Sequence, residues 1–466
     1  MSKLNKDILY LIFDELHDKN TLFSCLLVNK TWCEMIIRNL WRDPWKFKED
    51  RNGKLLLNTI VTHLSEESKN YLKSQGINIR SRSYNKILFN YITFCKHLNL
   101  SVIKMILNKI IENKSKIIII MNEILKLFIN DKTKFTHLYI PEKFDYQSNL
   151  IPEAKNCLSE IEFLSCDTSI NDKSLIGLME ICDSIKELEL FMELENNNYG
   201  FTKLIKQQKK LLKIHFFPNS KYPIYYPCDD SYYDAIENSL IKHSSTIEYL
   251  KTPRHINTII LSSFVNLKVL DMSNHYMNWE FKWNQNLIFP HLEILKVSRF
   301  SIHTVINIIE NTSGHLIEIS IEKVYWNNET IIQAIYQNCP KLKYLKMMLE
   351  HKDLLEFKNI LINCQDLNEL YIAAGHYFWG DLFEILAEYS PINLYKFTFT
   401  IMFIISESLD DFFKLWEGRR PMILKFFSNS KNIKKMMKYY KAKGIIEDYD
   451  YKLDYKDDLV WVRMCR

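Results

Sequence analysis

Residues 267–272 read LKVLDM, and this spacing, Leu-x-x-Leu-x-Leu with other aliphatics or Phe allowed, recurs along most of the chain. The recurring segments begin at residues 135, 158, 185, 211, 247, 267, 292, 316, 342, 367 and 394. Successive starts lie 20 to 27 residues apart, with one longer interval of 36. A near-constant period of this length is typical of repeat architectures, in which each unit buries its apolar face against its neighbours.

The stretches between these segments predict helices. Examples are NDKSLIGLMEIC (171–182), SIHTVINIIEN (301–311), NETIIQAIYQNC (328–339) and LLEFKNILINC (354–364). One strand and one helix per period is the pattern of a leucine-rich repeat. We therefore expect an α/β fold. Residues 131–466 would form a curved solenoid with parallel strands on the concave face, helices on the convex face and a polar, lysine-rich C-terminal cap.

Composition is that of a folded protein. The 466 residues are 47% hydrophobic and 25% charged, so we expect more than one structural unit and little disorder. The net charge is +5, with 24 Lys and Arg against 15 Asp and Glu in residues 1–150 (+9), and 37 against 41 in the remainder (−4). The basic residues are dispersed among Ile and Leu, which favours solvated helix faces over a nucleic-acid surface.

Catalytic and metal-binding patterns are missing from the sequence. The ten cysteines form no CxxC pair, and phosphate loops, HExxH and GxSxG are absent. Cys157, Cys182, Cys339 and Cys364 each precede a strand segment, where a small apolar filler is expected. We expect a non-enzyme with no metal and no cofactor.

No secretion signal begins the chain, and its most apolar run, KIIIIMNEILKLFIN (116–130), is interrupted by Glu123 and Lys126. We therefore expect a cytoplasmic or nuclear protein with no membrane partner.

The N-terminal stretch LNKDILYLIFDELHDKNTLFSCLLVNKTWCEMI (4–36) predicts about three short helices, the first capped by Asn5. Such a unit seldom folds without a partner. Residues 46–130 contain long periodic runs with few helix breakers, which predict a helical connector.

The order of apolar residues in this N-terminal stretch resembles the F-box. The matching residues are Leu4, Asp7, Ile8, Leu9, Ile12, Phe13, Leu16, Leu22, Cys25, Val28, Asn29, Lys30 and Trp32. The resemblance covers roughly residues 1–45. Two residues depart from the family pattern: Asn5 replaces the usual Pro, and Asp7 stands where Glu is common. We expect these departures to affect the affinity for an adaptor.

The resemblance implies that these helices bind the Skp adaptor and, through it, the cullin of a ubiquitin ligase. The implied adaptor-binding residues are Leu4, Ile8, Leu9, Ile12, Phe13, Leu22, Val28 and Trp32. The alternative is that they pack on the following helices, which is the role we expect for Leu16, Leu26 and Leu27.

The strand segments predict a binding wall, because residues between apolar anchors point away from the core. The candidate substrate-binding residues on this wall are Glu162, Glu189, Lys251, Asp271, Lys296, Lys346 and Tyr371. Acidic residues early and lysines later suggest a charge-graded groove, although solvent-facing strand positions are polar in any case.

Aromatic residues follow several strands, in HYMNWEFKW (275–283), VYWNN (324–328) and GHYFWG (375–380). Trp279, Trp283, Trp326 and Trp379 are candidates for a partner-binding rim, because exposed aromatics are common anchors. Covering the ends of the core is the alternative.

Together these features favour a substrate-recognition subunit of a cullin-RING ubiquitin ligase, which would hold an unidentified protein substrate on its repeats. The alternative is a repeat scaffold outside any ligase, with a vestigial F-box.

Overall fold

The structure is a computed structural model. It describes residues 5–16, 18–46, 50–77, 87–130, 132–141, 154–193, 197–218, 230–254, 256–273, 287–322, 328–374, 378–400, 406–426 and 431–451. These residues form two compact units. One lies within Met1–Ile214 and Pro227–Ser239, and the other lies within His215–Tyr226 and Leu240–Arg466.

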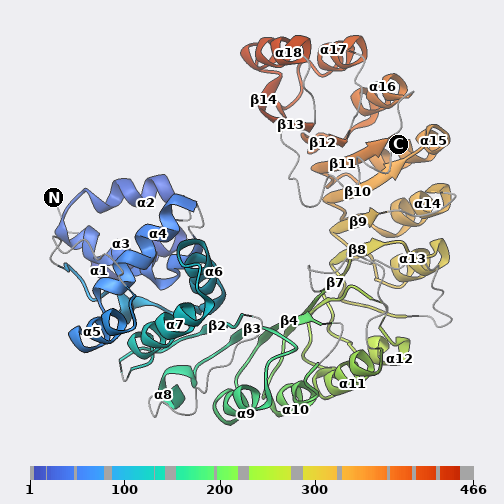
Figure 1. Cartoon of the computed structure of the whole chain (residues 1–466). Coiled ribbons are helices and arrows are strands. Elements are labelled where there is room, and N and C mark those ends of the chain that lie inside the picture. The colour runs from blue at the N-terminus through green and yellow to red at the C-terminus, as the bar shows by residue number, and fades with distance from the viewer. Residues whose placement is uncertain are drawn as a thin grey trace. The chain divides into compact units, whose positions relative to one another are not determined.

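The first unit begins with helices and continues as strands that alternate with helices (Figure 1). Its helices are α1 (Lys6–Glu15), α2 (Lys19–Leu26), α3 (Lys30–Arg42), α4 (Asp50–Thr62), α5 (Glu66–Ser74), α6 (Leu100–Ile110), α7 (Lys114–Phe128), α8 (Ala154–Leu158), α9 (Asp172–Ile181) and α10 (Gly200–Gln207), with 3-10 turns η1 (Pro44–Lys46) and η2 (Tyr91–Phe94). Its strands are β1 (His97–Asn99), β2 (His137–Tyr139), β3 (Phe163–Asp167) and β4 (Glu187–Met192). The unit boundaries fall at β5 (Lys213–Pro218) and α11 (Asp230–Leu240).

The second unit repeats the strand–helix alternation, and Figure 1 shows α13 to α16 in a row on one side of its strands. Its strands are β6 (Tyr249–Lys251), β7 (Val269–Met272), β8 (Ile294–Ser298), β9 (Glu318–Glu322), β10 (Tyr344–Leu349), β11 (Glu369–Ala374), β12 (Lys396–Thr400), β13 (Met422–Phe426) and β14 (Ile446–Asp450). Its helices are α12 (Thr258–Ser262), α13 (Ile302–Glu310), α14 (Asn328–Asn338), α15 (Leu354–Asn363), α16 (Trp379–Tyr389), α17 (Ser406–Leu415) and α18 (Lys431–Ala442), with 3-10 turns η4 (Ile241–His243) and η5 (His351–Asp353).

Strand pairing follows the sequence. Within each unit, β1 to β4 and β6 to β14 pair in parallel, each strand with the next one in the chain. Parallel neighbours need a crossover between them, and the intervening helices supply it. The predicted α/β class with parallel strands is confirmed.

The register explains why the repeat spacing has its period. Leu270 pairs with Leu295, and Leu295 pairs with Ile319, so equivalent anchors form one continuous row. All three side chains are fully buried. Burying an aliphatic side chain is worth roughly 1.5 to 3 kcal/mol, so each added repeat contributes to stability only because its neighbours cover its anchors.

One repeat has a different register from the one that the sequence predicts. The segment beginning at Leu158 places Glu162 between its last two anchors, but in the structure Leu164 pairs with Leu188 and Ser165 pairs with Glu189. The repeat therefore begins at Ile161. Two overlapping series of apolar residues fit the same spacing here, and pairing with β4 selects the later one.

A strand also occurs where the sequence predicts only helices. Strand β1 lies inside the expected connector, residues 46–130, and pairs in parallel with β2. The buried residues Cys95, Leu98 and Leu100 carry the repeat spacing. Because β1 has only three residues, its flanking helical patterns dominate any reading of the sequence.

The predicted role of the cysteines as buried filler agrees with their positions, and their thiols also join adjacent repeats. Cys157, Cys182, Cys339 and Cys364 are all buried. The Cys182 thiol donates to the Leu158 carbonyl at 3.7 Å, and the Cys364 thiol donates to the Cys339 carbonyl at 3.5 Å. Each thiol thus helps to satisfy a carbonyl at the helix end of the preceding repeat.

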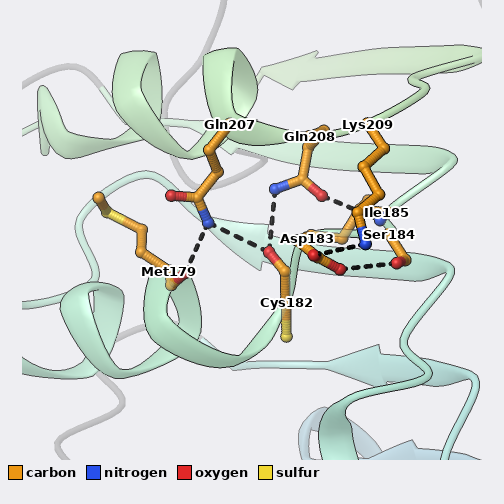
Figure 2. A network of polar contacts seen from close by, with 8 residues as sticks. All are labelled: Met179, Cys182, Asp183, Ser184, Ile185, Gln207, Gln208 and Lys209. Atoms are coloured by element: carbon orange, nitrogen blue, oxygen red, sulfur yellow. Dashed lines mark hydrogen bonds and ion pairs between the residues drawn. The ribbon is translucent and has the colours of Figure 1, made fainter.

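The side chains of Gln207 and Gln208 hold the α9–β4 connection against the next repeat by hydrogen bonds (Figure 2). The Gln208 amide donates to the carbonyls of Cys182 (3.1 Å) and Leu204 (2.8 Å), and its oxygen accepts from the Ile185 backbone N–H at 2.9 Å. Gln207 also donates to the Cys182 carbonyl, at 3.2 Å. Buried backbone groups that helix α9 and strand β4 leave unpaired are satisfied from the following repeat.

Replacing Gln208 by Ala should destabilise the first unit by about 1 to 3 kcal/mol, because the buried Ile185 N–H loses its acceptor. Urea unfolding and hydrogen exchange at the Ile185 amide measure the effect. The control is Gln365→Ala, since this exposed amide donates to Leu361 and Ile362 of the helix just before it, α15. Equal stability of the two variants would show that the hydrogen bonds of Gln208 to the α9–β4 connection do not stabilise the unit.

Candidate partner-binding surfaces

Side-chain caps define where the N-terminal helices begin. The Asn5 side chain accepts from the Asp7 backbone N–H at 3.3 Å and starts α1, as the sequence predicts. Asp18 caps α2 by accepting from Thr21 N–H, and Asn29 caps α3 by accepting from Trp32 N–H. Caps of this kind contribute roughly 1 kcal/mol each.

The three helices share a small core of their own. Its buried members are Leu9, Phe13, Leu22, Met35, Ile36 and Leu40. The Phe13 ring meets the half-buried Trp32 ring edge to face at 5.1 Å. The Asn39 amide donates to the Phe13 carbonyl at 2.7 Å, which ties the end of α1 to α3.

Helix α1 has a second apolar face that the described residues leave uncovered. Ile8 lies one turn before Leu11 and Ile12 on this face, and the three residues are 47%, 69% and 45% exposed. We call these three residues the α1 stripe. Leu27 and Val28, in the turn after α2, are also exposed. Adjacent exposed aliphatic residues are typical of partner-binding surfaces.

The predicted adaptor-binding residues separate into two groups. Ile8, Ile12 and Val28 are exposed, and Trp32 is half-buried. Leu9, Phe13 and Leu22 lie in the core instead, because the opposite face of α1 and one residue of α2 must cover α3. These three position the surface and do not form it. Leu4 lies outside the described residues.

Sequence reasoning missed part of this surface. Leu11 and Phe23 are exposed, and Leu27, which we expected to pack internally, is 89% exposed. Leu16 and Leu26 pack against the core as predicted. A helical projection of α1 places Leu11 beside Ile8 and Ile12, so the signal was present in the spacing. Leu27 lies beyond the end of α2, where helical spacing no longer applies.

The strand positions facing away from the helices carry paired charges. Lys251 pairs with Asp271 at 3.2 Å, and Lys296 pairs with Glu318 at 2.8 Å. Lys346 contacts Glu322 at 2.8 Å and also lies over the Tyr371 ring. These lysines are matched by carboxylates from adjacent strands, which differs from the expected basic half of a groove.

Only some residues of the predicted substrate-binding wall are accessible to solvent. Glu162 is exposed, and Glu189, Lys251 and Lys296 are partly exposed. Asp271, Lys346 and Tyr371 are buried, contrary to the expectation for solvent-facing positions. They are covered because the side chains of neighbouring repeats stand close together along parallel strands and pack on one another.

The prediction that Trp379 belongs to a partner-binding rim is wrong. This residue is 3% exposed at the start of α16, where its ring packs on Phe383 and Phe399 at about 5.5 Å. The alternative interpretation, an aromatic that covers the core, holds at this position. Trp279, Trp283 and Trp326 lie outside the described residues.

Stacked rings line the corresponding face of the first unit. His97 stacks on His137 with centroids 3.8 Å apart, and His137 stacks on Phe163 at 5.2 Å. Burial lowers the pKa of His97 to about 3, helped by the charges of His137, Lys46 and Arg42. The Asp43 carboxylate, 3.3 Å from His97 Nδ1, opposes this shift because it would pair with a protonated ring. Burial also lowers the pKa of His137. Both rings are therefore neutral near pH 7.

Two kinds of reactive group, metal clusters and activated thiols, can be checked among the described residues. Among them, no group of three or more His, Cys, Asp or Glu side chains could hold a metal ion. Burial raises the pKa of Cys95, Cys182 and Cys364 to about 12, so these thiols are poor nucleophiles. Nor does the described part of the chain contain a helix with the length and apolar character needed to span a bilayer.

Comparison of the chain with protein-family models and with curated proteins finds no match. Function therefore has to be inferred from the chemistry of these surfaces.

The stability of the first unit should fall as pH drops from 6.5 toward 5. His97 stays neutral in the folded state but binds a proton in the unfolded state, so stability present above pH 6.5 is lost below it. One such histidine accounts for about 2 kcal/mol over this interval.

Replacing His97 by Phe keeps a ring on His137 and removes this titration, so the variant should lose about 2 kcal/mol less than wild type. Urea unfolding at pH 6.5 and pH 5 measures the difference. The exposed His291→Phe variant is the control and should behave as wild type does. An unchanged pH dependence in His97→Phe would show that His97 is protonated in the folded chain.

Proposed function

We propose that this protein is a substrate-recognition subunit of a cullin-RING ubiquitin ligase. In this proposal its N-terminal helices form an F-box that binds the Skp adaptor, and its repeats, which we take as leucine-rich repeats, hold a protein substrate. The protein itself would carry no catalytic residue.

The α1 stripe is the observation that supports this proposal. A three-helix unit that buries Leu9 and Phe13 in its own core has no internal need for Ile8, Leu11 and Ile12 to be aliphatic. Exposed aliphatic residues cost solubility, so their presence on one face favours a permanent or recurrent partner. The F-box resemblance of the same helices supports the Skp adaptor as the proposed partner.

The repeats would contribute by positioning. A substrate held on the strand faces is kept at a high local concentration near the transferring subunits, which accelerates transfer without any chemistry by this chain. Glu189, Lys251 and Lys296 are the accessible members of the predicted wall, so they are the first residues to test for substrate contact. Glu162 is not among them, because it lies before β3 and Ser165 holds the equivalent position between the anchors.

The competing proposal is a repeat scaffold whose F-box-like helices only cap the first repeats. The burial of Leu9, Phe13 and Leu22 favours it, since three residues of the F-box pattern serve the helices' own core. The two proposals differ in one property, because only the ligase subunit binds the adaptor.

Wild-type chain should capture purified Skp adaptor in a pull-down, and Ile8→Asp/Ile12→Asp should reduce capture at least tenfold (~1.4 kcal/mol), because two carboxylates would be buried at the interface. Both positions are exposed, so the variant should keep the circular dichroism spectrum of wild type. A Phe13 substitution is unsuitable, because that side chain is 2% exposed in the core.

The matched control is Leu355→Asp/Ile392→Asp, which changes two exposed aliphatic residues of the second unit. It should capture the adaptor as wild type does. Absence of capture by the folded wild-type chain would contradict the ligase proposal and favour the scaffold.

A further inference from the structure

A pocket of about 360 Å³ lies between the N-terminal helices and the start of the repeats in the first unit. Residues from α1, α3 and η2 line it, together with the residues just before β1 and β2. Its polar and aromatic lining includes Tyr10, Asp14, Arg38, Arg42, Phe94 and Lys96. The volume is in the range of small-molecule sites, roughly 300 to 1,000 Å³.

The charged residues of the lining are mostly basic. Arg38, Arg42 and Lys96 share the pocket with one carboxylate, that of Asp14. The Arg42 guanidinium is 4.0 Å from the Asp14 carboxylate and both side chains are 57% exposed, so this contact neutralises little. Arg38 and Arg42 also lie one turn apart on α3, where like charges repel. An anion between them would relieve that repulsion.

One side of the pocket is apolar. Phe13, Met35 and Phe94 contribute to the wall, and the Arg38 guanidinium lies over the Phe94 ring at 5.3 Å. This contact holds one guanidinium against an aromatic surface. A ligand with both an anionic group and an apolar body would match the two kinds of wall.

Hydrogen bonds fix the elements around the pocket. The Lys96 backbone N–H donates to the Arg42 carbonyl at 2.9 Å, which joins the end of α3 to the residue before β1. The Thr136 N–H donates to the Lys96 carbonyl at 2.8 Å. The Trp41 ring stacks on Tyr91 of η2 at 4.6 Å. The basic groups therefore project from a preorganised frame, which lowers the entropy cost of binding.

We propose that this pocket binds a small phosphate monoester with an apolar body, its phosphate between Arg38, Arg42 and Lys96 and its body against Phe94 and Tyr10. Two guanidiniums and one ammonium suit a dianion with several acceptor oxygens, whereas one arginine is enough for a carboxylate. Tyr10 and Asp14 lie on a different flank of α1 from the α1 stripe, so this site is separate from the adaptor-binding surface of the proposed function.

Isothermal titration calorimetry of the full chain with phenyl phosphate tests the proposal, with inorganic phosphate and phenol as partial probes. Phenyl phosphate should bind saturably and more tightly than either partial probe. Arg38→Gln/Arg42→Gln should weaken that binding at least about tenfold, because charge-assisted hydrogen bonds are lost. The control Lys435→Gln/Lys438→Gln removes the same charge from exposed positions on α18 and should bind as wild type does.

Lys96→Gln, which leaves α3 unchanged, is the second variant and should also weaken binding. It keeps the proposal testable if the arginine variant is poorly folded by circular dichroism. Failure of phenyl phosphate to bind at millimolar concentration would overturn the proposal, as would equal affinity in the variants and the control. Inorganic phosphate binding as tightly as phenyl phosphate would overturn the apolar part. A phosphotyrosine pentapeptide that binds where phenyl phosphate does not would show that the ligand is a peptide.

Discussion

The structure depends on one constraint, namely that the apolar anchors of a strand are covered only when the strands before and after it are in register. Leu270, Leu295 and Ile319 form a single buried row because each strand pairs in parallel with the next. The helix of each repeat then covers the row from one side, and groups such as Gln208 satisfy the backbone where helix and strand meet. Stability is thus a property of neighbouring pairs of repeats and not of any single repeat.

Much of this architecture can be predicted from the sequence, because the anchor spacing is local and repeated. The α/β class, the alternation of strands and helices and the buried cysteines follow from it. The register at Leu158 does not, since two overlapping series fit and only pairing with β4 selects Ile161. The short strand β1 could not be predicted from the sequence either. Three residues between helices give too weak a local pattern, although they pair with β2.

The candidate surfaces were harder to predict, because spacing does not determine which apolar face is covered. Ile8 and Phe13 belong to the same F-box pattern, yet one is exposed and the other is in the core. Likewise, Lys346 stands at a strand position that should face solvent, but Glu322 and Tyr371 from adjacent repeats enclose it. Such outcomes depend on contacts between residues that are distant in sequence, as does the basic pocket.

The central functional claim is that the exposed face of α1 binds a partner, while another face of the same helix packs in the three-helix core. Hydrogen exchange of the full chain, followed by mass spectrometry with and without purified Skp adaptor, tests this most directly. The account predicts that the adaptor slows exchange in α1 and in the turn at Leu27 and Val28, and leaves β6 to β14 unchanged. Unchanged exchange in α1 at saturating adaptor would contradict it.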